Sequence, residues 1–234
     1  MAAQQVSDDI LERYRKVGTA TVYSGVNRLG FGPCVMRGVS NFTPGKRLAG
    51  RAKTLRFVPP RTDIAEEPAH GRESAEYRAM GSCGPGDVLV CDGLGKTTAA
   101  VGGDIKLLQL KLVGAEGIVT DASVRDMNAI RAYGYAVFTG GRTPATGPPQ
   151  IAPHEDNVVI QCGGVAVRPG DVIVGDDDGV VVVPSGPAAE VIEWCEEHEE
   201  AEEYIKGLIV KENVSPGKHY TAETFERFHR ERGD

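Results

Sequence analysis

The chain has 234 residues, a formal net charge of −7 and 41% hydrophobic residues, which suits one large globular domain with a substantial core. The acidic balance, without a long Lys/Arg run, argues against direct binding to a nucleic-acid backbone. No apolar run reaches the roughly 20 residues that span a bilayer, and the beginning lacks the pattern of a signal peptide, so we expect a cytoplasmic location without membrane attachment. The five scattered cysteines form no CxxC pair, which argues against a disulfide framework or a cysteine-rich zinc site.

The first third of the chain predicts two helices and then strand-rich structure. Residues 7–18 place a set of apolar side chains on one helical face: Val6, Ile10, Leu11, Tyr14 and Val17. A second helix over 19–30 closes at Gly30. Residues 47–59 mix apolar and basic side chains in a strand-rich stretch. Residues 60–80 are polar without a clean period, so we expect a loop with one helical turn.

The central third alternates strands and helices. We expect strands over 88–91, 117–121 and 135–141, with helices beginning near Asp104 and at residue 127. In the first of these helices, Ile105, Leu108 and Leu112 recur at helical spacing, and Leu107 and Leu110 widen the stripe. Gly114 fits the position just past its end. This alternation predicts an α/β core.

The last third predicts β-structure followed by a helix. Residues 163–184 are β-runs separated by Pro-Gly-Asp and Asp-Asp-Asp-Gly turns, which favours an antiparallel meander. A Glu-rich helix over about residues 187–209 follows, with Cys195, Ala201, Ile205 and Leu208 packed beneath it, and then a polar tail.

Several enzyme classes lack residues that their chemistry requires. The segment CDGLGKTT has Val90 where a phosphate-binding loop needs its first glycine, and GLGKTTAAVGG lacks the third glycine of a dinucleotide fingerprint. Neither Ser24 nor Ser82 stands in a GxSxG elbow, which argues against a serine hydrolase. We expect Lys106 and Lys111 on the solvent side of their helix, which argues against a Schiff-base aldolase.

A candidate anion site lies where Gly102 and Gly103 precede Asp104. The first turn of a helix presents unpaired N–H groups and the positive end of its dipole, and glycines let a ligand approach the backbone. Such a site suits a carboxylate or a phosphate. The alternative is that Asp104 simply caps the helix.

Charged residues follow the neighbouring strand ends, where ligands bind in α/β sheets: Asp92, Asp121, Arg125 and Asp126. Arg125 could hold a substrate carboxylate through paired hydrogen bonds. Asp126 offers a hard oxygen ligand for Mg²⁺, although it could instead cap the next helix. A metal that polarises a ketone and an arginine that stabilises an enolate suit cleavage of a 2-oxo acid to pyruvate.

Three segments carry a family resemblance: PGDVLVCDG, GGDIKLLQLKLVGAEGIVTDASVRD and GDVIVGDDDGVVVVP. Together they resemble RraA-like proteins and class II 4-hydroxy-4-methyl-2-oxoglutarate (HMG) aldolases, many of which carry the legacy label dimethylmenaquinone methyltransferase. These aldolases share an aspartate, twenty intervening residues and then Arg-Asp, as Asp104, residues 105–124 and Arg125-Asp126 do here. Ala122 stands where many relatives have glycine.

The resemblance implies a β/β/α swivelling-domain sandwich, with residues 1–234 as one RraA-like domain carrying an N-terminal helical segment and a C-terminal helical arm. It implies cleavage of HMG or a related 4-hydroxy-2-oxo acid to pyruvate, with decarboxylation of oxaloacetate as a further activity. Asp126 would hold Mg²⁺ or Mn²⁺, Arg125 would bind the substrate, and Asp104 would organise metal-bound water and proton transfer. The pyruvate would contact the loop and helix start, formed by Gly103, Asp104, Ile105 and Lys106.

The resemblance also implies a homotrimer or homohexamer with sites between subunits. A glutamate from the neighbour's C-terminal arm would approach the metal waters, with Glu199, Glu202 and Glu203 as candidates. The alternative function is that of RraA, a non-catalytic regulator that binds ribonuclease E or another protein. Asp104 and the long C-terminal segment favour the aldolase, because relatives of the RraA type commonly lack both.

Overall fold

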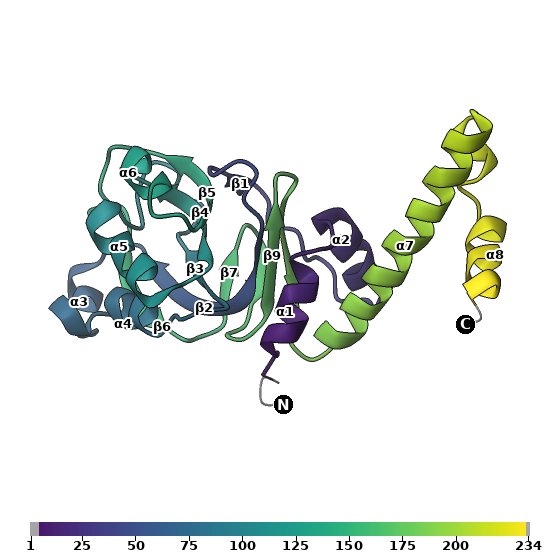
Figure 1. The fold of residues 1–234 in the computed structure, drawn as a ribbon. Helices are drawn as coiled ribbons and strands as arrows, with labels where there is room; N and C mark the ends of the chain where they lie inside the picture. Colours follow the sequence, from purple (N-terminus) through teal and green to yellow (C-terminus); the bar gives the residue numbers. More distant parts are fainter. Residues whose placement is uncertain (1–4, 233–234) are drawn as a thin grey trace.

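A mixed eight-stranded sheet forms the centre of the molecule in the computed structural model, which describes residues 5–232 (Figure 1). The strand order is β1-β5-β4-β3-β2-β9-β10, and β6 also pairs with β2. Its parallel part comprises β2 (Leu48–Val58), β3 (Asp87–Asp92), β4 (Gly117–Val124) and β5 (Ala136–Arg142). The antiparallel strands are β1 (Ser40–Asn41), β6 (Ala152–Asp156), β9 (Val172–Asp176) and β10 (Gly179–Val183).

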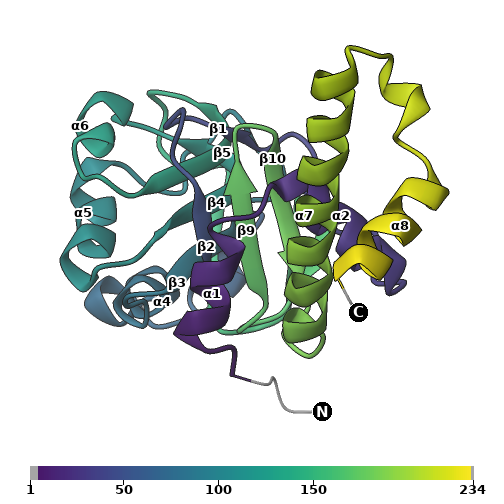
Figure 2. The same cartoon turned by 45° about the vertical axis from the view of Figure 1, so that its right-hand side comes forward.

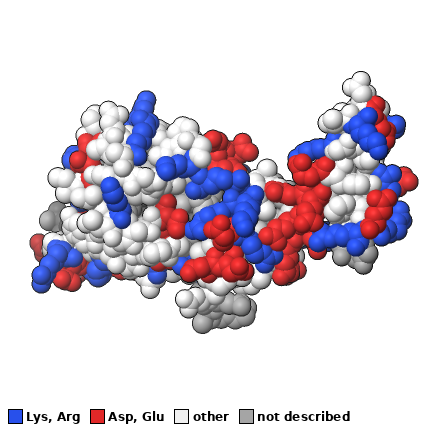
Figure 3. Space-filling model, viewed as in Figure 1, with Lys and Arg blue, Asp and Glu red and all other residues white. Residues whose placement is uncertain are grey.

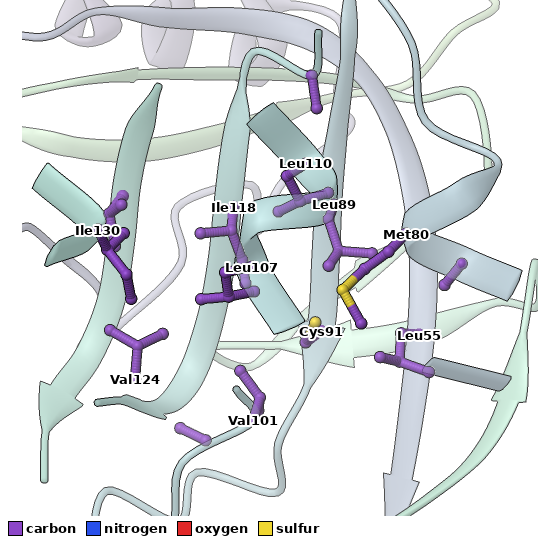
Figure 4. Close-up of a cluster of buried hydrophobic side chains, with 14 of the residues drawn as sticks. Leu55, Met80, Leu89, Cys91, Val101, Leu107, Leu110, Ile118, Val124 and Ile130 are labelled. Atoms are coloured by element: carbon purple, nitrogen blue, oxygen red, sulfur yellow. The ribbon is translucent and has the colours of Figure 1, made fainter. Parts of the chain in front are cut away.

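Three helices cover one face of the parallel strands: α4 (Ala75–Gly81), α5 (Asp104–Val113) and α6 (Met127–Arg131). Leu89 of β3 and Ile118 of β4 point toward Leu107 and Leu110 of α5 (Figure 4). Each such side chain, when fully buried, contributes about 1.5–3 kcal/mol. The expected helix end is confirmed, since Gly114 caps α5 in the left-handed conformation with φ 74°.

The exposed face of α5 corrects one expectation. Ile105 and Leu112 are 84% and 76% exposed and Leu108 is also exposed, whereas Leu107 and Leu110 are buried. Apolar side chains occupy both sides of this helix, so helical spacing alone cannot determine which side faces the sheet. Of the expected apolar stripe, the Ile105, Leu108 and Leu112 part therefore lies on the surface, and the Leu107 and Leu110 part forms the core.

A small β-layer covers the opposite face of the central sheet. It consists of β7 (Ile160–Cys162) and β8 (Val165–Val167), which pair antiparallel and enclose a second core against the strands. The predicted meander is confirmed for β9 and β10, which form an antiparallel hairpin, but β8 pairs with β7 instead of β9. Helices, sheet and this second β-layer form the expected β/β/α arrangement.

A third hydrophobic core lies on β9 and β10 and contains side chains from the N-terminal and the C-terminal parts of the chain. Helices α1 (Asp8–Tyr14), α2 (Thr19–Arg28) and α7 (Ala188–Glu212) meet there. The predicted apolar face of the first helix is confirmed, with Leu11 and Tyr14 fully buried. The Tyr14 hydroxyl donates to the Ala188 carbonyl oxygen at 2.7 Å, which ties α1 to the start of α7. Cys195 and Ile205 of α7 are buried as predicted.

Two segments contain more helix than the sequence predicted. After α7, the polar tail forms η2 (Pro216–Lys218) and α8 (Ala222–Arg232), and α8 folds back beside α7 (Figure 2). The ring of His198 stacks between Trp194 and Phe225, at centroid distances of 4.6 and 5.2 Å. Residues 60–80 form α3 (Thr62–Ala65), η1 (Gly71–Glu73) and α4. Within residues 5–232, no helix is both long and apolar enough to cross a membrane.

Candidate active site

The start of α5 meets the end of β4 through the backbone. Val101 donates its N–H to the Ser123 carbonyl oxygen at 2.9 Å, and the Arg125 N–H donates to the Gly102 carbonyl oxygen at 3.1 Å. These two bonds hold the loop before α5 against the loop after β4. The twenty residues between Asp104 and Arg125 contain the rest of α5 and all of β4, and the two bonds bring the first turn of α5 next to the carboxyl end of β4.

A carboxylate from the second loop occupies the N-terminus of α5. Oδ2 of Asp126 accepts the N–H of Asp104 at 3.3 Å and lies 3.2 Å from Nε of Arg125. The side chains of Arg125 and Asp126 are 39% and 38% exposed, so the pair remains open to a ligand. Asp104, Arg125 and Asp126 are thus brought together as predicted.

Gly103 makes this approach possible. A Cβ atom at this position would overlap with Oδ2 of Asp126 and would lie only 2.7 Å from Nε of Arg125. Any side chain here would force the Arg125–Asp126 pair away from the helix start.

The two capping alternatives have different outcomes. Asp126 occupies the N-cap position of α6 with a left-handed φ of 60°, but its side chain makes no capping bond to that described helix. Its carboxylate instead accepts the Asp104 N–H at the start of α5. Asp104 is the first residue of α5, whose N-cap position is Gly103, so it is not the cap, although its Oδ1 accepts the N–H of Ile105 within the first turn at 2.8 Å.

A pocket of about 400 Å³ lies over this helix start, and we call it the α5 pocket. The predicted substrate-binding residues all line it: Gly103, Asp104, Ile105, Lys106 and Arg125. An adjacent hollow of about 710 Å³ is lined by Asp126 together with Asp104, Arg125 and Arg142. Asp126 therefore faces the hollow, while Asp104 and Arg125 border both spaces.

Glu76 is a pocket residue that sequence reasoning missed. It comes from α4, in the segment for which a loop was expected, and its Oε2 lies 2.6 Å from Nζ of Lys106. Lys106 was expected at the solvent side, yet it is half-buried over the pocket and also lies 5.9 Å from the Tyr77 ring centroid. No local motif around Glu76 indicates this pairing.

Asp92 and Asp121 lie outside the α5 pocket, which corrects their grouping with the other strand-end residues. Successive strand side chains alternate between faces, and both carboxylates point to the face covered by β7. Gln161 of β7 donates from Nε2 to Asp92 Oδ1 at 2.5 Å and to Asp121 Oδ2 at 2.9 Å. Oδ1 of Asp121 also accepts the Gly93 N–H at 2.8 Å. These residues anchor β7, and burial raises the pKa of Asp92.

The acidic run of α7, residues 196–203, lies at the other end of the molecule from α5 (Figures 1 and 3). Glu199 accepts the Gly18 N–H at 2.7 Å, and Glu203 pairs with Lys206 at 2.6 Å. Glu202 accepts a hydrogen bond from the Tyr220 hydroxyl at 3.2 Å. None of these described glutamates lines the pocket of its own chain.

Comparison with known proteins places this geometry in a family. The family described as Aldolase/RraA matches residues 6–182, which is most of the chain. The chain belongs to the RraA-like family. A relative from Halalkalibacterium halodurans, named "Putative 4-hydroxy-4-methyl-2-oxoglutarate aldolase", is 30% identical over 210 residues, covering 90% of this chain and 92% of the relative.

Solved structures agree with the RraA-like assignment. RraAS2 of Streptomyces coelicolor, described as an unusual member of the RNase ES inhibitor RraA protein family, has a TM-score of 0.79 and 30% identity. The match covers 87% of this chain and 98% of RraAS2. An uncharacterized Pseudomonas syringae protein has a TM-score of 0.81 and 23% identity, covering 93% and 95% of the two chains, and this likeness concerns the fold alone.

The donor set of this RraA-like site fits a largely hydrated cation. Within residues 5–232, no group of three or more His, Cys, Asp or Glu side chains gathers as a metal site. Asp104 and Asp126 nevertheless border the same hollow with hard oxygen donors. Mg²⁺ suits such a set, because it retains several waters and is often bound through one or two carboxylates.

Proposed function

We propose that this chain is a divalent-metal-dependent carbon–carbon lyase that cleaves HMG or a related 4-hydroxy-2-oxo acid to pyruvate. The observation that carries this proposal is the meeting of Asp104, Arg125 and Asp126 at the start of α5. The name of the Halalkalibacterium relative supports the same reaction. We extend the proposal to decarboxylation of oxaloacetate, because it passes through the same pyruvate enolate.

Arg125 and the first turn of α5 would bind the pyruvyl half of the substrate. The guanidinium has five N–H donors and lines the α5 pocket, while its Nε lies next to Asp126. The helix N-terminus adds a positive potential for a carboxylate. In this position Arg125 also stabilises the negative charge that develops on the enolate oxygen.

Cleavage requires proton transfer as well as charge stabilisation. The C3–C4 bond breaks, its electron pair forms the enolate, and the 4-hydroxyl loses its proton as the second carbonyl product forms. Asp104, at the border between pocket and hollow, would position water that accepts this proton and returns it to C3 of the enolate, which completes pyruvate. Asp126 would hold Mg²⁺ or Mn²⁺, which when bound supplies Lewis-acid polarisation of the keto oxygen.

We further propose a homotrimer or homohexamer with its sites between subunits. The glutamates of α7 lie far from the pocket of their own chain, so one could reach a pocket only in a neighbouring subunit. The exposed Ile105, which lines the pocket, and the exposed Leu112 near the other end of α5 support coverage of this helix by such a neighbour.

Pyruvate release tests the proposal. The purified protein is assayed with HMG and with 4-hydroxy-2-oxopentanoate in Mg²⁺ or Mn²⁺, with and without EDTA. Arg125→Ala is expected to lower kcat/KM by about 10²–10³-fold, because one transition-state charge contact is worth ~3–4 kcal/mol. Arg72→Ala, which removes an arginine that is 93% exposed, is the matched control. Pyruvate release that EDTA does not change would exclude the proposed metal. Full activity of Arg125→Ala would show that Arg125 has only a structural role.

The likeness to RraAS2 favours a second candidate, a non-catalytic regulator that binds a ribonuclease. Its acidic surface could then compete for a basic segment of the partner. Salt-sensitive capture of a ribonuclease of the E type, together with no lyase activity on any 2-oxo acid, would favour the regulator over the lyase.

A further inference from the structure

A second arginine borders the candidate site from β5. Arg142 is the last residue of β5 and the register partner of Val124, which directly precedes Arg125. Thr143, the next residue, donates its N–H to the Val124 carbonyl oxygen at 3.1 Å. The sheet therefore holds the end of β5 against the loop that carries Arg125, and it fixes the position of Arg142 beside that loop.

The Arg142 side chain lies on the face of the sheet that carries the site. Register partners in neighbouring strands direct their side chains to the same face, and Val124 packs in the core beneath α5 and α6. In agreement with this, Arg142 lines the hollow of about 710 Å³ that Asp104, Arg125 and Asp126 also line. The hollow therefore contains two arginines.

The two guanidinium groups differ in how they are engaged. Nε of Arg125 lies 3.2 Å from the Asp126 carboxylate. The exposed guanidinium of Arg142 makes no hydrogen bond or ion pair with any residue in the range 5–232. Its five N–H donors form a planar fork that matches a carboxylate through two parallel hydrogen bonds. Arg142 is therefore available to bind a carboxylate of a ligand.

A substrate held by Arg125 can extend in two directions, because Arg125 borders both the α5 pocket and the hollow. In the α5 pocket the other cation is Lys106, whose Nζ lies 2.6 Å from Oε2 of Glu76. In the hollow the other cation is Arg142, which has no such partner among the described residues. A second substrate carboxylate therefore gains more in the hollow than in the pocket.

The charges that line the hollow also suit a dianion. Asp104 and Asp126 are negative, and Arg125 and Arg142 are positive, so the four side chains sum to zero. A divalent cation bound at Asp126 would leave an excess of two positive charges. A substrate with two carboxylates balances this excess, whereas a substrate with one carboxylate leaves half of it uncompensated.

We infer that Arg142 makes this site specific for 4-hydroxy-2-oxo dicarboxylic acids. It binds the carboxylate at the distal end of the substrate, while Arg125 binds the carboxylate of the pyruvyl half. The inference rests on the proposed lyase function and deepens it, because HMG carries both of these carboxylates. Arg142 contributes binding and orientation of the substrate and takes no part in the proton transfer.

The first test compares two substrates that differ only at the distal end. With the same metal, kcat/KM is measured for 4-hydroxy-2-oxoglutarate and for 4-hydroxy-2-oxopentanoate, which has a methyl group in place of the distal carboxylate. The wild type is expected to favour the glutarate by about tenfold or more, as a hydrogen bond to a charged group allows. Arg142→Gln is expected to lower kcat/KM for the glutarate by about tenfold and to change that for the pentanoate by less than about threefold.

The second test measures binding without cleavage. 2-Oxoglutarate and 2-oxopentanoate differ at the distal end in the same way, and neither has the 4-hydroxyl that the cleavage requires. Calorimetry in Mg²⁺ is expected to show about tenfold tighter binding of 2-oxoglutarate to the wild type, and Arg142→Gln should abolish the difference. Arg37→Gln is the matched control, because Arg37 is an exposed arginine that lines neither the α5 pocket nor the hollow. It should leave both ratios unchanged.

The outcomes separate the inference from the function on which it rests. Equal use of the two cleavable substrates by the wild type, or an Arg142→Gln variant with the wild-type ratio, overturns the inference while the lyase proposal stands. An equal change in Arg37→Gln also overturns it, because the effect would then come from the overall charge of the protein. Pyruvate from neither substrate overturns the lyase proposal, and the calorimetric ratio then tests the carboxylate site at Arg142 by itself.

Discussion

The backbone N–H of Asp104 donates to the Asp126 carboxylate at 3.3 Å, although twenty-one residues separate the two positions in the chain. The bond joins the first turn of α5 to the loop after β4. It places a hard oxygen ligand at the positive end of a helix, next to an arginine. A helix start that suits an anion and a carboxylate that could hold a cation therefore border one another, which is the arrangement that the proposed cleavage of a 2-oxo acid would use.

Gly103→Ala is expected to lower kcat/KM for pyruvate release by at least about 10²-fold, because a methyl group would displace Arg125 and Asp126 from the helix start. Thermal unfolding should change far less than activity, since both side chains are about 40% exposed. Activity assays and a melting curve on the same preparation check both parts.

Gly207→Ala is the control for this substitution. Gly207 lies within α7 with open space around its Cβ position, so alanine should stabilise the helix by about 1 kcal/mol and leave activity unchanged. Full activity of Gly103→Ala would mean that the Arg125–Asp126 pair need not lie against α5.

Much of the α/β core could be predicted because its signals are local. Glycines end the helices, Pro-Gly-Asp turns begin the strands, and apolar runs between them are too short for anything but buried strands. The meeting of the site residues could be predicted from the same signals, because the carboxyl ends of neighbouring parallel strands lie at the same edge of the sheet. The roles of Asp104, Arg125 and Asp126, and the extent of a single domain over 1–234, remain predictions.

The predictions that were wrong or missing concern tertiary contacts, which no local sequence pattern indicates. Helix α5 has two apolar stripes, and only its tertiary contacts select Leu107 over Ile105 for the core. Asp121 lies within β4, the strand that Arg125 follows, and the alternation of side chains along β4 directs it to the β7 side. Glu76 lies in a polar segment without helical period, and it pairs with Lys106, thirty residues away in the chain.

Asp92→Asn is expected to change the pH dependence of stability. Burial, with repulsion from Asp121 adding to it, raises the pKa of Asp92 above its ordinary value. A raised pKa in the folded state means that the folded protein binds this proton more tightly, so wild-type stability falls as pH rises between the ordinary and the raised value. Asparagine can keep the acceptor for Gln161 but carries no charge.

The variant should therefore gain stability relative to the wild type as pH rises above the ordinary aspartate pKa, and the gain should level off above the raised pKa of Asp92. Urea unfolding at several pH values measures this difference. An equal loss of stability at every pH would show that folding does not shift the pKa of Asp92 and that the loss comes from altered hydrogen bonds or packing.

The cysteines should resist modification in the native protein. All five are free and buried, and burial raises the pKa of both Cys83 and Cys195 to about 12. Because the thiolate is the reactive form, a thiol reagent such as Ellman's reagent should label almost nothing at pH 8 until denaturant is added. Rapid labelling of one thiol in the native protein would reveal local opening of the core that holds it.

Leu112→Asp is expected to weaken subunit association. Leu112 is 76% exposed near the end of α5, in a stripe of exposed aliphatic residues that water would otherwise cover. A charge in a contact between subunits loses its hydration, so the oligomer should dissociate at protein concentrations where the wild type stays assembled. Light scattering after size exclusion measures the mass. Val159→Asp, at an exposed valine outside α5, should leave the mass unchanged. If Leu112→Asp keeps the wild-type mass at micromolar concentration, the stripe lies outside the interface, and the pocket must be completed from another direction.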